Sequence, residues 1–175
     1  MSAIDLAILG MVLEKPQSAY DLQKDVTYHN FSRWTRISAP SVYKRVLRLR
    51  NQGYLESRQE PGDRAGSKAV YSITESGRAY FLQEMAACAS RPVPLLFDFN
   101  VVITNLNKIP QDQALALAEQ LRQSLQASRE ETAGYARTYA DIPLVGRTIF
   151  DQQLGLYDAL LDWLDGFVRQ FQAEA

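Results

Sequence analysis

The chain is poor in the residues that build most catalytic and metal sites. Its 175 residues include one histidine, His29, and one cysteine, Cys88. A zinc cluster, a Ser-His-Asp triad or a Cys-His pair needs more of these side chains, and no Gly-rich phosphate-binding loop occurs. Asp158 and Asp162 lie four residues apart and are typical of the solvated face of a helix. The sequence therefore predicts no enzyme, no metal site and no cofactor.

The sequence also predicts no disulfide, no secretory leader and no membrane span. One cysteine excludes an intramolecular disulfide, and Cys88 is typical of a small packed side chain. The start, MSAIDLAILGMVLEKP, has no basic leader or cleavage site of a secretory signal. The longest apolar stretch, residues 95–106, is interrupted by one aspartate and two asparagines and is too short for a bilayer. We therefore expect a cytoplasmic protein with no membrane partner.

Acidic residues are missing from one region of a chain that is otherwise nearly neutral. Lys plus Arg number 19 and Asp plus Glu number 20 overall. Residues 1–82 hold 12 basic and 8 acidic residues, whereas residues 83–175 hold 7 and 12. From Val26 to Leu55 no acid occurs, and six of the thirty positions are Lys or Arg. Either a solvated surface or a surface facing phosphates explains this excess.

The first half has the helix and turn signals of a winged helix-turn-helix. Four helices are expected, over residues 4–13, 18–26, 38–53 and 74–90. Ser18 with Asp21 resembles a capping box, and Ser38 and Thr74 are good N-caps. Strand-like segments 54–59 and 68–73 enclose EPGDRAGS, whose Pro and Gly residues indicate an exposed hairpin tip. Three helices, a hairpin and a fourth helix is the winged-helix order.

The third predicted helix separates apolar from cationic side chains. At 100° per residue, one arc holds Val42, Val46, Leu49, Tyr43 and Leu47. The opposite arc holds Ser41, Lys44, Arg45 and Arg48. Arg64 and Lys68 at the hairpin tip offer a second contact to the same phosphate backbone. This pattern favours a helix that enters the major groove of double-stranded DNA.

The second half contains helix signals only. Pro94 is expected to start a short apolar helix to Leu106, Pro110 a long one to about Tyr139, and the last helix follows Pro143. Its apolar residues alternate spacings of four and three, a coiled-coil seam: Phe150, Leu154, Tyr157, Leu161, Leu164, Val168 and Phe171. A second apolar stripe runs beside the seam: Ile149, Leu156, Leu160, Trp163 and Phe167. We expect a second copy of the chain to bury these two apolar stripes in a dimer. The alternative is that they are buried within one helical domain.

Three segments resemble the PadR-type transcriptional regulators, over residues Ile4 to about Leu82: AILGMVLEKPQSAYDLQ, ISAPSVYKRVLRLRNQGYL and AVYSITESGRAYF. The residues that fit are Ser41, Tyr43, Gly53, Tyr71, Thr74, Glu75 and Gly77. Ala19 departs from the pattern because the family usually has Gly at this position. Arg50 departs from it because the family often has an acid there. The resemblance implies that the Tyr43 phenol touches the DNA backbone, whereas the residues alone equally allow a half-buried core tyrosine.

The resemblance also implies dimerisation through the C-terminal helices. It implies either a small hydrophobic, often aromatic, effector held between the two domains or no ligand at all. Four aromatic side chains could line such a pocket, although each residue type is more often core: Trp34, Phe97, Phe99 and Trp163.

The predicted fold is mainly α with a small β-hairpin wing. A winged helix-turn-helix DNA-binding domain is expected over 1–90 and an all-α dimerisation domain over 91–175. The predicted function is a dimeric transcriptional regulator, a repressor that binds an inverted-repeat operator. The predicted DNA-binding residues are Ser41, Tyr43, Lys44, Arg45, Arg48, Arg64 and Lys68. The alternative is a winged-helix module that docks an acidic protein surface, since fold does not fix function.

Overall fold

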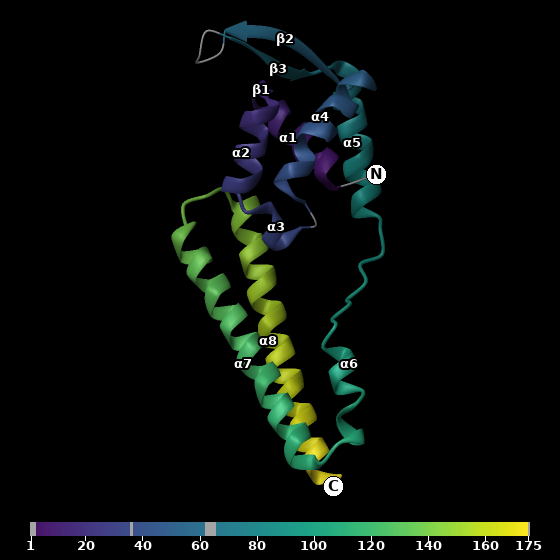
Figure 1. Cartoon of the computed structure of the whole chain (residues 1–175), viewed down its shortest axis with the longest axis vertical. Coiled ribbons are helices and arrows are strands. Elements are labelled where there is room, and N and C mark those ends of the chain that lie inside the picture. The colour runs from purple at the N-terminus through teal and green to yellow at the C-terminus, as the bar shows by residue number, and fades with distance from the viewer. Residues whose placement is uncertain (1–2, 36, 62–65, 175) are drawn as a thin grey trace. The chain divides into compact units, whose positions relative to one another are not determined.

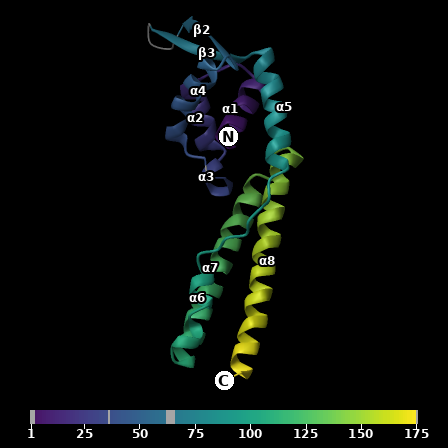
Figure 2. The ribbon, with the colours of Figure 1, turned by 90° about the vertical axis from the view of Figure 1, so that its right-hand side faces the viewer.

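The computed structural model describes residues 3–35, 37–61 and 66–174. The chain divides into two compact units, Met1–Val93 and Pro94–Ala175. The first unit contains five α-helices and a three-stranded sheet among its described residues, and the second is helical (Figures 1 and 2). The predicted fold class, mainly α with a small β-wing, is confirmed. Among the described helices, none has the length and apolar character that a membrane span needs.

The core of the first unit is built from α1 (Ala3–Glu14), α2 (Ala19–Tyr28) and α4 (Val42–Asn51). The apolar helix α1 packs against α4, the strand β3 (Ser67–Ile73) and α5 (Glu75–Ala89). The largest fully buried side chains of this unit come from α1, α2, α4 and the start of the strand β2 (Leu55–Pro61): Ile8, Leu9, Leu22, Val42, Val46, Leu49 and Leu55. Val42, Val46 and Leu49 therefore fix one narrow side of α4 inside the protein.

Two predicted helix caps are confirmed. The Ser18 side chain accepts a hydrogen bond from the Asp21 backbone N–H at 3.1 Å and starts α2. Thr74 accepts from the Gly77 N–H at 3.0 Å and starts α5. Each cap satisfies a donor that the first turn of a helix leaves without an intrahelical partner.

The sheet has three strands in the order β1, β3, β2, all antiparallel. β2 (Leu55–Pro61) and β3 (Ser67–Ile73) form the predicted hairpin, with Leu55 opposite Ile73. The two-residue β1 (Gln17–Ser18) pairs with Tyr71 and Val70 and was not predicted, because two residues carry no periodic signal. The short helix α3 (Phe31–Trp34) was also not predicted.

Hydrogen bonds link the end of α4 to the start of α5. Gly53 has φ +80°, a left-handed conformation that glycine adopts without strain. Its carbonyl oxygen accepts hydrogen bonds from the hydroxyls of Thr74 at 2.7 Å and Ser76 at 2.9 Å. A methyl group added at Gly77 would overlap the carbonyl oxygen of Tyr54. These contacts set the position of α4 relative to α5.

The second unit is an antiparallel helix pair preceded by an irregular segment. α7 (Gln111–Thr138) and α8 (Leu144–Ala173) follow Pro110 and Pro143, as predicted. The predicted helix from Pro94 to Leu106 is wrong over most of its length: only α6 (Asn100–Ile103) is α-helical, and the 3₁₀ turn η2 (Leu106–Lys108) follows. Asp98 and two asparagines, which compete for backbone hydrogen bonds, interrupt that segment.

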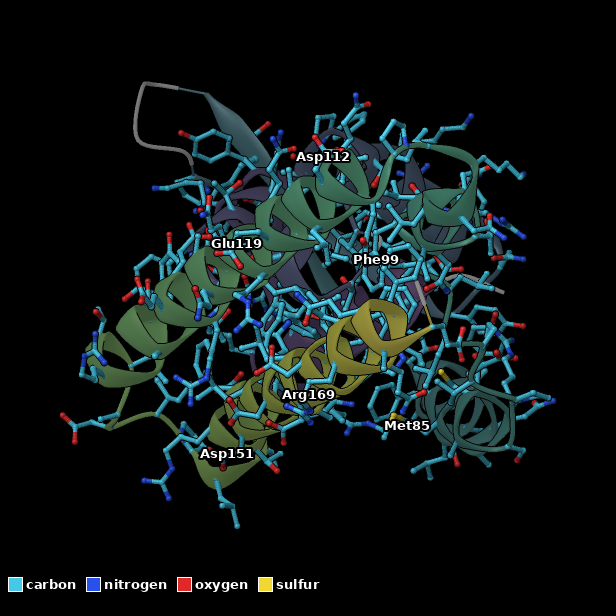
Figure 3. All side chains as sticks on the ribbon, turned by 90° about the horizontal axis from the view of Figure 1, so that it is seen from below. Met85, Phe99, Asp112, Glu119, Asp151 and Arg169 are labelled. Carbon is cyan, nitrogen blue, oxygen red and sulfur yellow. The ribbon has the colours of Figure 1, made fainter. Side chains whose placement is uncertain are left out.

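The α7–α8 pair has an apolar seam flanked by ion pairs. Figure 3 shows the two helices obliquely, from below. Leu164 of α8 is fully buried against Ala118 and Leu125 of α7. Arg122 pairs with Asp165, and Arg129 pairs with Asp158. The two arginines lie seven residues apart on α7 and their partners seven apart on α8, in the reverse order. The ion pairs therefore match one antiparallel register of the two helices.

Candidate nucleic-acid interface

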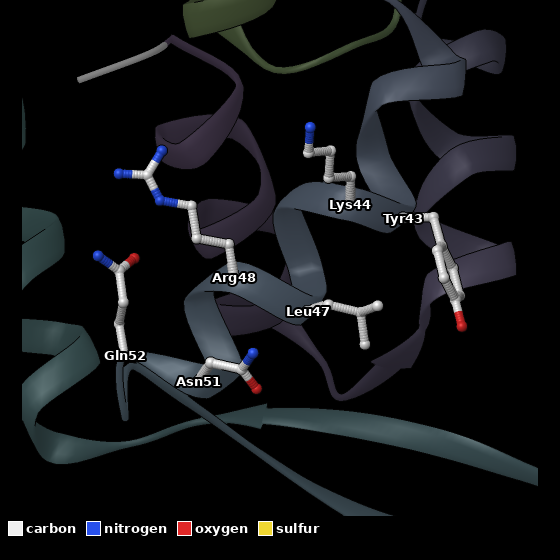
Figure 4. A pocket seen from close by; sticks show the side chains of 6 residues that line it. All are labelled: Tyr43, Lys44, Leu47, Arg48, Asn51 and Gln52. Carbon is white, nitrogen blue, oxygen red and sulfur yellow. The ribbon is translucent and has the colours of Figure 1, made fainter.

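The outward face of α4 is broader than the sequence predicted. Its side chains line an open surface depression (Figure 4): Tyr43, Lys44, Leu47, Arg48, Asn51 and Gln52. Tyr43 is 60% exposed and Leu47 is half-buried outside the core cluster. The prediction that these two residues share the core arc with Val42 is therefore wrong. The helical wheel placed both residues in the core because they are apolar. Apolar character alone does not distinguish a core position from an exposed one.

Two cations on this face have side chains free for a ligand. Lys44 and Arg48 are exposed, and neither side chain has a hydrogen bond or ion pair among the described residues. They lie four residues apart, on the same face of the helix. An unpaired guanidinium can donate two parallel hydrogen bonds to a guanine edge or a phosphate. The face therefore carries two positive charges that no acid in the described part of the chain neutralises by direct pairing.

Arg45 has a different environment from Lys44 and Arg48. Its Nη1 lies 3.6 Å from Oδ2 of Asp5, a residue of α1 that is only 4% exposed. The other carboxylate oxygen of Asp5 is buried without a hydrogen-bond partner among the described residues. A contact of Arg45 with DNA would share or break this ion pair. Sequence reasoning missed Asp5, although an acid inside the apolar run AIDLAILGMVLE was a usable signal.

The N-terminal end of α4 is a tight turn. The predicted helix start at Ser38 is wrong in detail, because the 3₁₀ turn η1 (Ala39–Ser41) precedes α4. Ser38 makes no side-chain cap bond, since its hydroxyl donates to the Ser41 hydroxyl at 3.3 Å instead. The Ser41 hydroxyl donates to the Ser38 carbonyl at 2.6 Å. Ser41 is half-buried at the start of the helix and keeps an oxygen that can accept a further hydrogen bond.

The wing carries fewer free charges than predicted. Lys68 of β3 lies 3.7 Å from the Asp21 carboxylate on α2. The Ser18 hydroxyl donates to the same carboxylate at 2.7 Å, and this hydrogen bond, with the charge of Lys68, lowers the pKa of Asp21. Arg58 of β2 pairs with Glu60 at 2.6 Å. The predicted contact Arg64 lies outside the described residues, as does Arg36 of the acid-free segment.

Three of the four aromatic residues predicted for an effector pocket lie together. The rings of Phe97 and Phe99 stack at 5.1 Å between centroids, and Phe99 lies 6.0 Å from Trp163. Trp163 is 41% exposed. Trp34 belongs to the first unit, where its ring lies 4.6 Å from Phe31. A pocket that combines all four residues stays a prediction.

Most of the residues predicted for dimerisation contact other residues of the same chain. Tyr157, Leu161, Leu164 and Val168 belong to the apolar cluster between α7 and α8 of the same chain. Phe150 stacks with Tyr139, and Phe171 packs beside Phe167. Leu154 is half-buried. Much of the predicted seam is therefore covered within one chain, and the second stripe of α8 carries the exposed apolar side chains Leu156 and Trp163.

These features define a class of protein: a winged helix whose α4 presents an open cationic face, as in DNA-binding winged helices. Residues 8–83 match the Transcriptional regulator PadR-like family. The resemblance to PadR-type regulators stated from the sequence motifs is therefore confirmed over these residues.

Three solved structures are similar to the chain over nearly its whole length. Bacillus subtilis PadR in complex with operator DNA has a TM-score of 0.78 and 17% identity, covering 97% of this chain and 99% of that one. Bacillus subtilis PadR in complex with p-coumaric acid has a TM-score of 0.75 and 18% identity, covering 97% and 98%. The Vibrio cholerae virulence activator AphA has a TM-score of 0.71 and 17% identity, covering 98% and 99%. At these identities the similarity establishes a shared fold. No curated protein matches the chain.

Proposed function

We propose that this chain binds double-stranded DNA by placing the outward face of α4 in the major groove. The observation that carries the proposal is the presence on that face of the exposed cations Lys44 and Arg48, neither of which has an ion pair within residues 3–35, 37–61 and 66–174. Between and beside them lie groups that hydrogen-bond base edges, on Asn51 and Gln52. An arginine bonds bidentately to guanine, and Asn or Gln to adenine. The face therefore offers both the charge that DNA affinity needs and the donors that base reading needs.

The contacts to the DNA backbone come from the edges of this surface. Ser41 lies at the start of the helix, and the exposed Tyr43 phenol can donate to a phosphate oxygen. Arg64 and Lys68 are the proposed contacts of the wing. Lys68 is 43% exposed beside Asp21, so a phosphate would compete with this weak ion pair. Arg45 would reach DNA at the expense of its pairing with Asp5.

We also propose that the active form is a homodimer that binds an inverted repeat. The exposed residues Leu156 and Trp163 are seven apart on α8 and form one apolar face. Burial of such a face against a second copy stabilises a two-fold dimer. A two-fold dimer presents two copies of α4, which fit two half-sites related by the same axis.

The proposed regulation is repression released by a small aromatic or hydrophobic molecule. The stacked Phe97, Phe99 and half-exposed Trp163 can take an aromatic ring against their faces. The similar Bacillus subtilis PadR was solved with p-coumaric acid, a phenolic compound, which makes such molecules the first to test. The Vibrio cholerae relative is an activator, so the sign of regulation needs its own assay.

Selection from a random duplex pool tests the DNA-binding proposal. The full-length protein should enrich sequences that contain an inverted repeat, and its affinity for them should fall steeply as salt rises, because bound phosphates release counterions. Light scattering on the complex should give two chains per duplex. Failure to enrich any sequence, together with binding to acidic proteins through α4, would support the protein-docking alternative.

A further inference from the structure

Leu47 is an apolar residue on the outward face of α4. It lies near the middle of the outward face of α4, one turn from Tyr43 on one side and from Asn51 on the other (Figure 4). It is half-buried, but it is not among the residues packed against the core of the first unit. The other five residues around the depression carry a charge or a hydrogen-bonding group. Leu47 is therefore the one aliphatic residue among lining residues whose side chains end in charged or hydrogen-bonding groups.

The surroundings of Leu47 disfavour an apolar protein partner. Lys44 and Arg48 border it, and both would lose hydration against an apolar surface without gaining a charge partner. A major groove meets both needs at once, because phosphates line its edges and its floor carries one apolar group, the C5-methyl group of thymine. Contact between an aliphatic side chain and that methyl group removes apolar surface from water.

We infer that Leu47 is a specificity-determining residue that reads the C5-methyl group of one thymine in each half-site. The inference rests on the proposed insertion of α4 in the major groove. It adds an apolar contact to the hydrogen bonds proposed for Arg48 on the same helix. In each half-site, one thymine should therefore contribute to affinity through its methyl group and not through its hydrogen-bonding groups.

Replacement of thymine by deoxyuracil isolates that contact, because it removes the methyl group and keeps every base-pairing and hydrogen-bonding group. In the duplex enriched by the wild-type protein, each thymine of one half-site is replaced in turn, with its symmetry mate in the other. One position should weaken binding by about fourfold per half-site, the ratio expected for loss of one buried methyl group. Leu47→Ala should bind the thymine duplex more weakly and should bind thymine and uracil duplexes equally.

Two further variants serve as controls. Leu47→Met retains an apolar end and should retain the preference for thymine. Leu82→Ala removes a 68% exposed leucine from α5 and should leave both affinity and preference unchanged. Uracil substitutions without effect at every position would overturn the inference, as would a thymine preference that survives in folded Leu47→Ala. Either result leaves DNA binding itself intact, whereas a wild-type protein that binds no duplex contradicts the proposed function.

Discussion

Arg45 Nη1 lies 3.6 Å from Asp5 Oδ2 and so links α4 to α1 within the first unit. The partners differ in exposure: the Asp5 side chain is 5% exposed and the Arg45 side chain 28%. Within the described part of the chain, the arginine is the only ion-pair partner of Asp5, whereas the guanidinium still reaches water. The pair links α4 to α1, whereas Lys44 and Arg48 on the outward face have no ion pair with any residue that the structure describes.

This difference in exposure predicts that substitutions of Arg45 and Asp5 lower the free energy of unfolding by different amounts. Arg45→Ala leaves a buried carboxylate without a counter-charge and should lower the free energy of unfolding by about 2 kcal/mol or more. Asp5→Asn removes the buried charge and lets Arg45 turn to solvent, so it should cost about 1 kcal/mol or less. Urea unfolding of both variants measures the difference. Equal costs would show that the ion pair does not determine the stability of this helix contact.

Gly77 should tolerate no side chain. A Cβ at this position overlaps the Tyr54 carbonyl oxygen, which is backbone and cannot rotate away. Gly77→Ala should therefore destabilise the protein by about 3 kcal/mol and loosen the link between α4 and α5. Gly134→Ala in α7 is the matched control, because the added methyl group meets only the far end of Arg137 at 4.0 Å. The control should be stabilising by up to about 1 kcal/mol in thermal unfolding.

Asp21 gives the first unit an acid-sensitive contact. The Ser18 hydroxyl and the nearby Lys68 lower the pKa of this carboxyl group. A lowered pKa in the folded state means that the contribution is complete above the unfolded value of about 3.9 and is lost as pH falls through the folded value. Because Asp21 is 43% exposed, the loss in Asp21→Asn should be only about 0.5 kcal/mol at pH 7.

The same difference should shrink as pH falls through the folded-state pKa, because the wild-type carboxyl group is then protonated too. Unfolding curves at pH 7 and at a series of lower pH values measure it. Lys68→Met should have little further effect in the Asp21→Asn background, since the carboxylate that it pairs with is already gone. A difference that persists at the lower pH would mean that Asp21 acts through packing and not through its charge.

Many element boundaries could be predicted from the sequence because local chemistry sets them. Ser18 and Thr74 cap helices by bonds within three residues, and Pro110 and Pro143 precede helices whatever the rest of the chain does. The failures involve contacts between distant residues. β1 exists only because β3 supplies its partner strand, and the role of Asp5 depends on Arg45, forty positions further along.

The helical wheel of α4 failed in a way that the proposed function explains. Hydrophobicity places Tyr43 and Leu47 with the core, yet only Val42, Val46 and Leu49 are buried in this helix. A surface that contacts a ligand keeps apolar side chains exposed, so sequence pattern and burial disagree there. For the same reason Asn51 and Gln52 were missed, because their side chains give no periodic signal until the outward direction of the helix is known.

The proposed dimer predicts different outcomes for exposed and buried residues of α8. Changing Leu156 and Trp163 together to Glu should give a folded monomer, because 39% and 41% of these side chains are exposed in the single chain. Leu164→Ala should instead unfold the α7–α8 pair more easily, by about 2 to 5 kcal/mol, because Leu164 is fully buried against α7. Light scattering and circular dichroism separate the two effects. A double variant that stays a dimer would exclude this face as the interface.

Truncation before Pro143 makes a related prediction. It removes α8 and exposes the apolar side of α7 around Ala118 and Leu125. The shortened chain should be a monomer or an aggregate with weak DNA binding, because simultaneous engagement of two half-sites is lost. A truncated protein that remains a clean dimer would contradict the assignment of the interface to α8.

The central claim, that α4 reads DNA, is tested most directly by the salt-dependent affinity of Arg48→Ala for the selected duplex and for a scrambled one. The variant should lose about tenfold or more on the selected duplex and less on the scrambled one, because an arginine on a guanine edge carries sequence information. Arg64→Ala, at the predicted wing tip, should weaken both duplexes alike and lower the salt slope by about one. A folded Arg48→Ala protein with unchanged affinity and unchanged preference would contradict the claim.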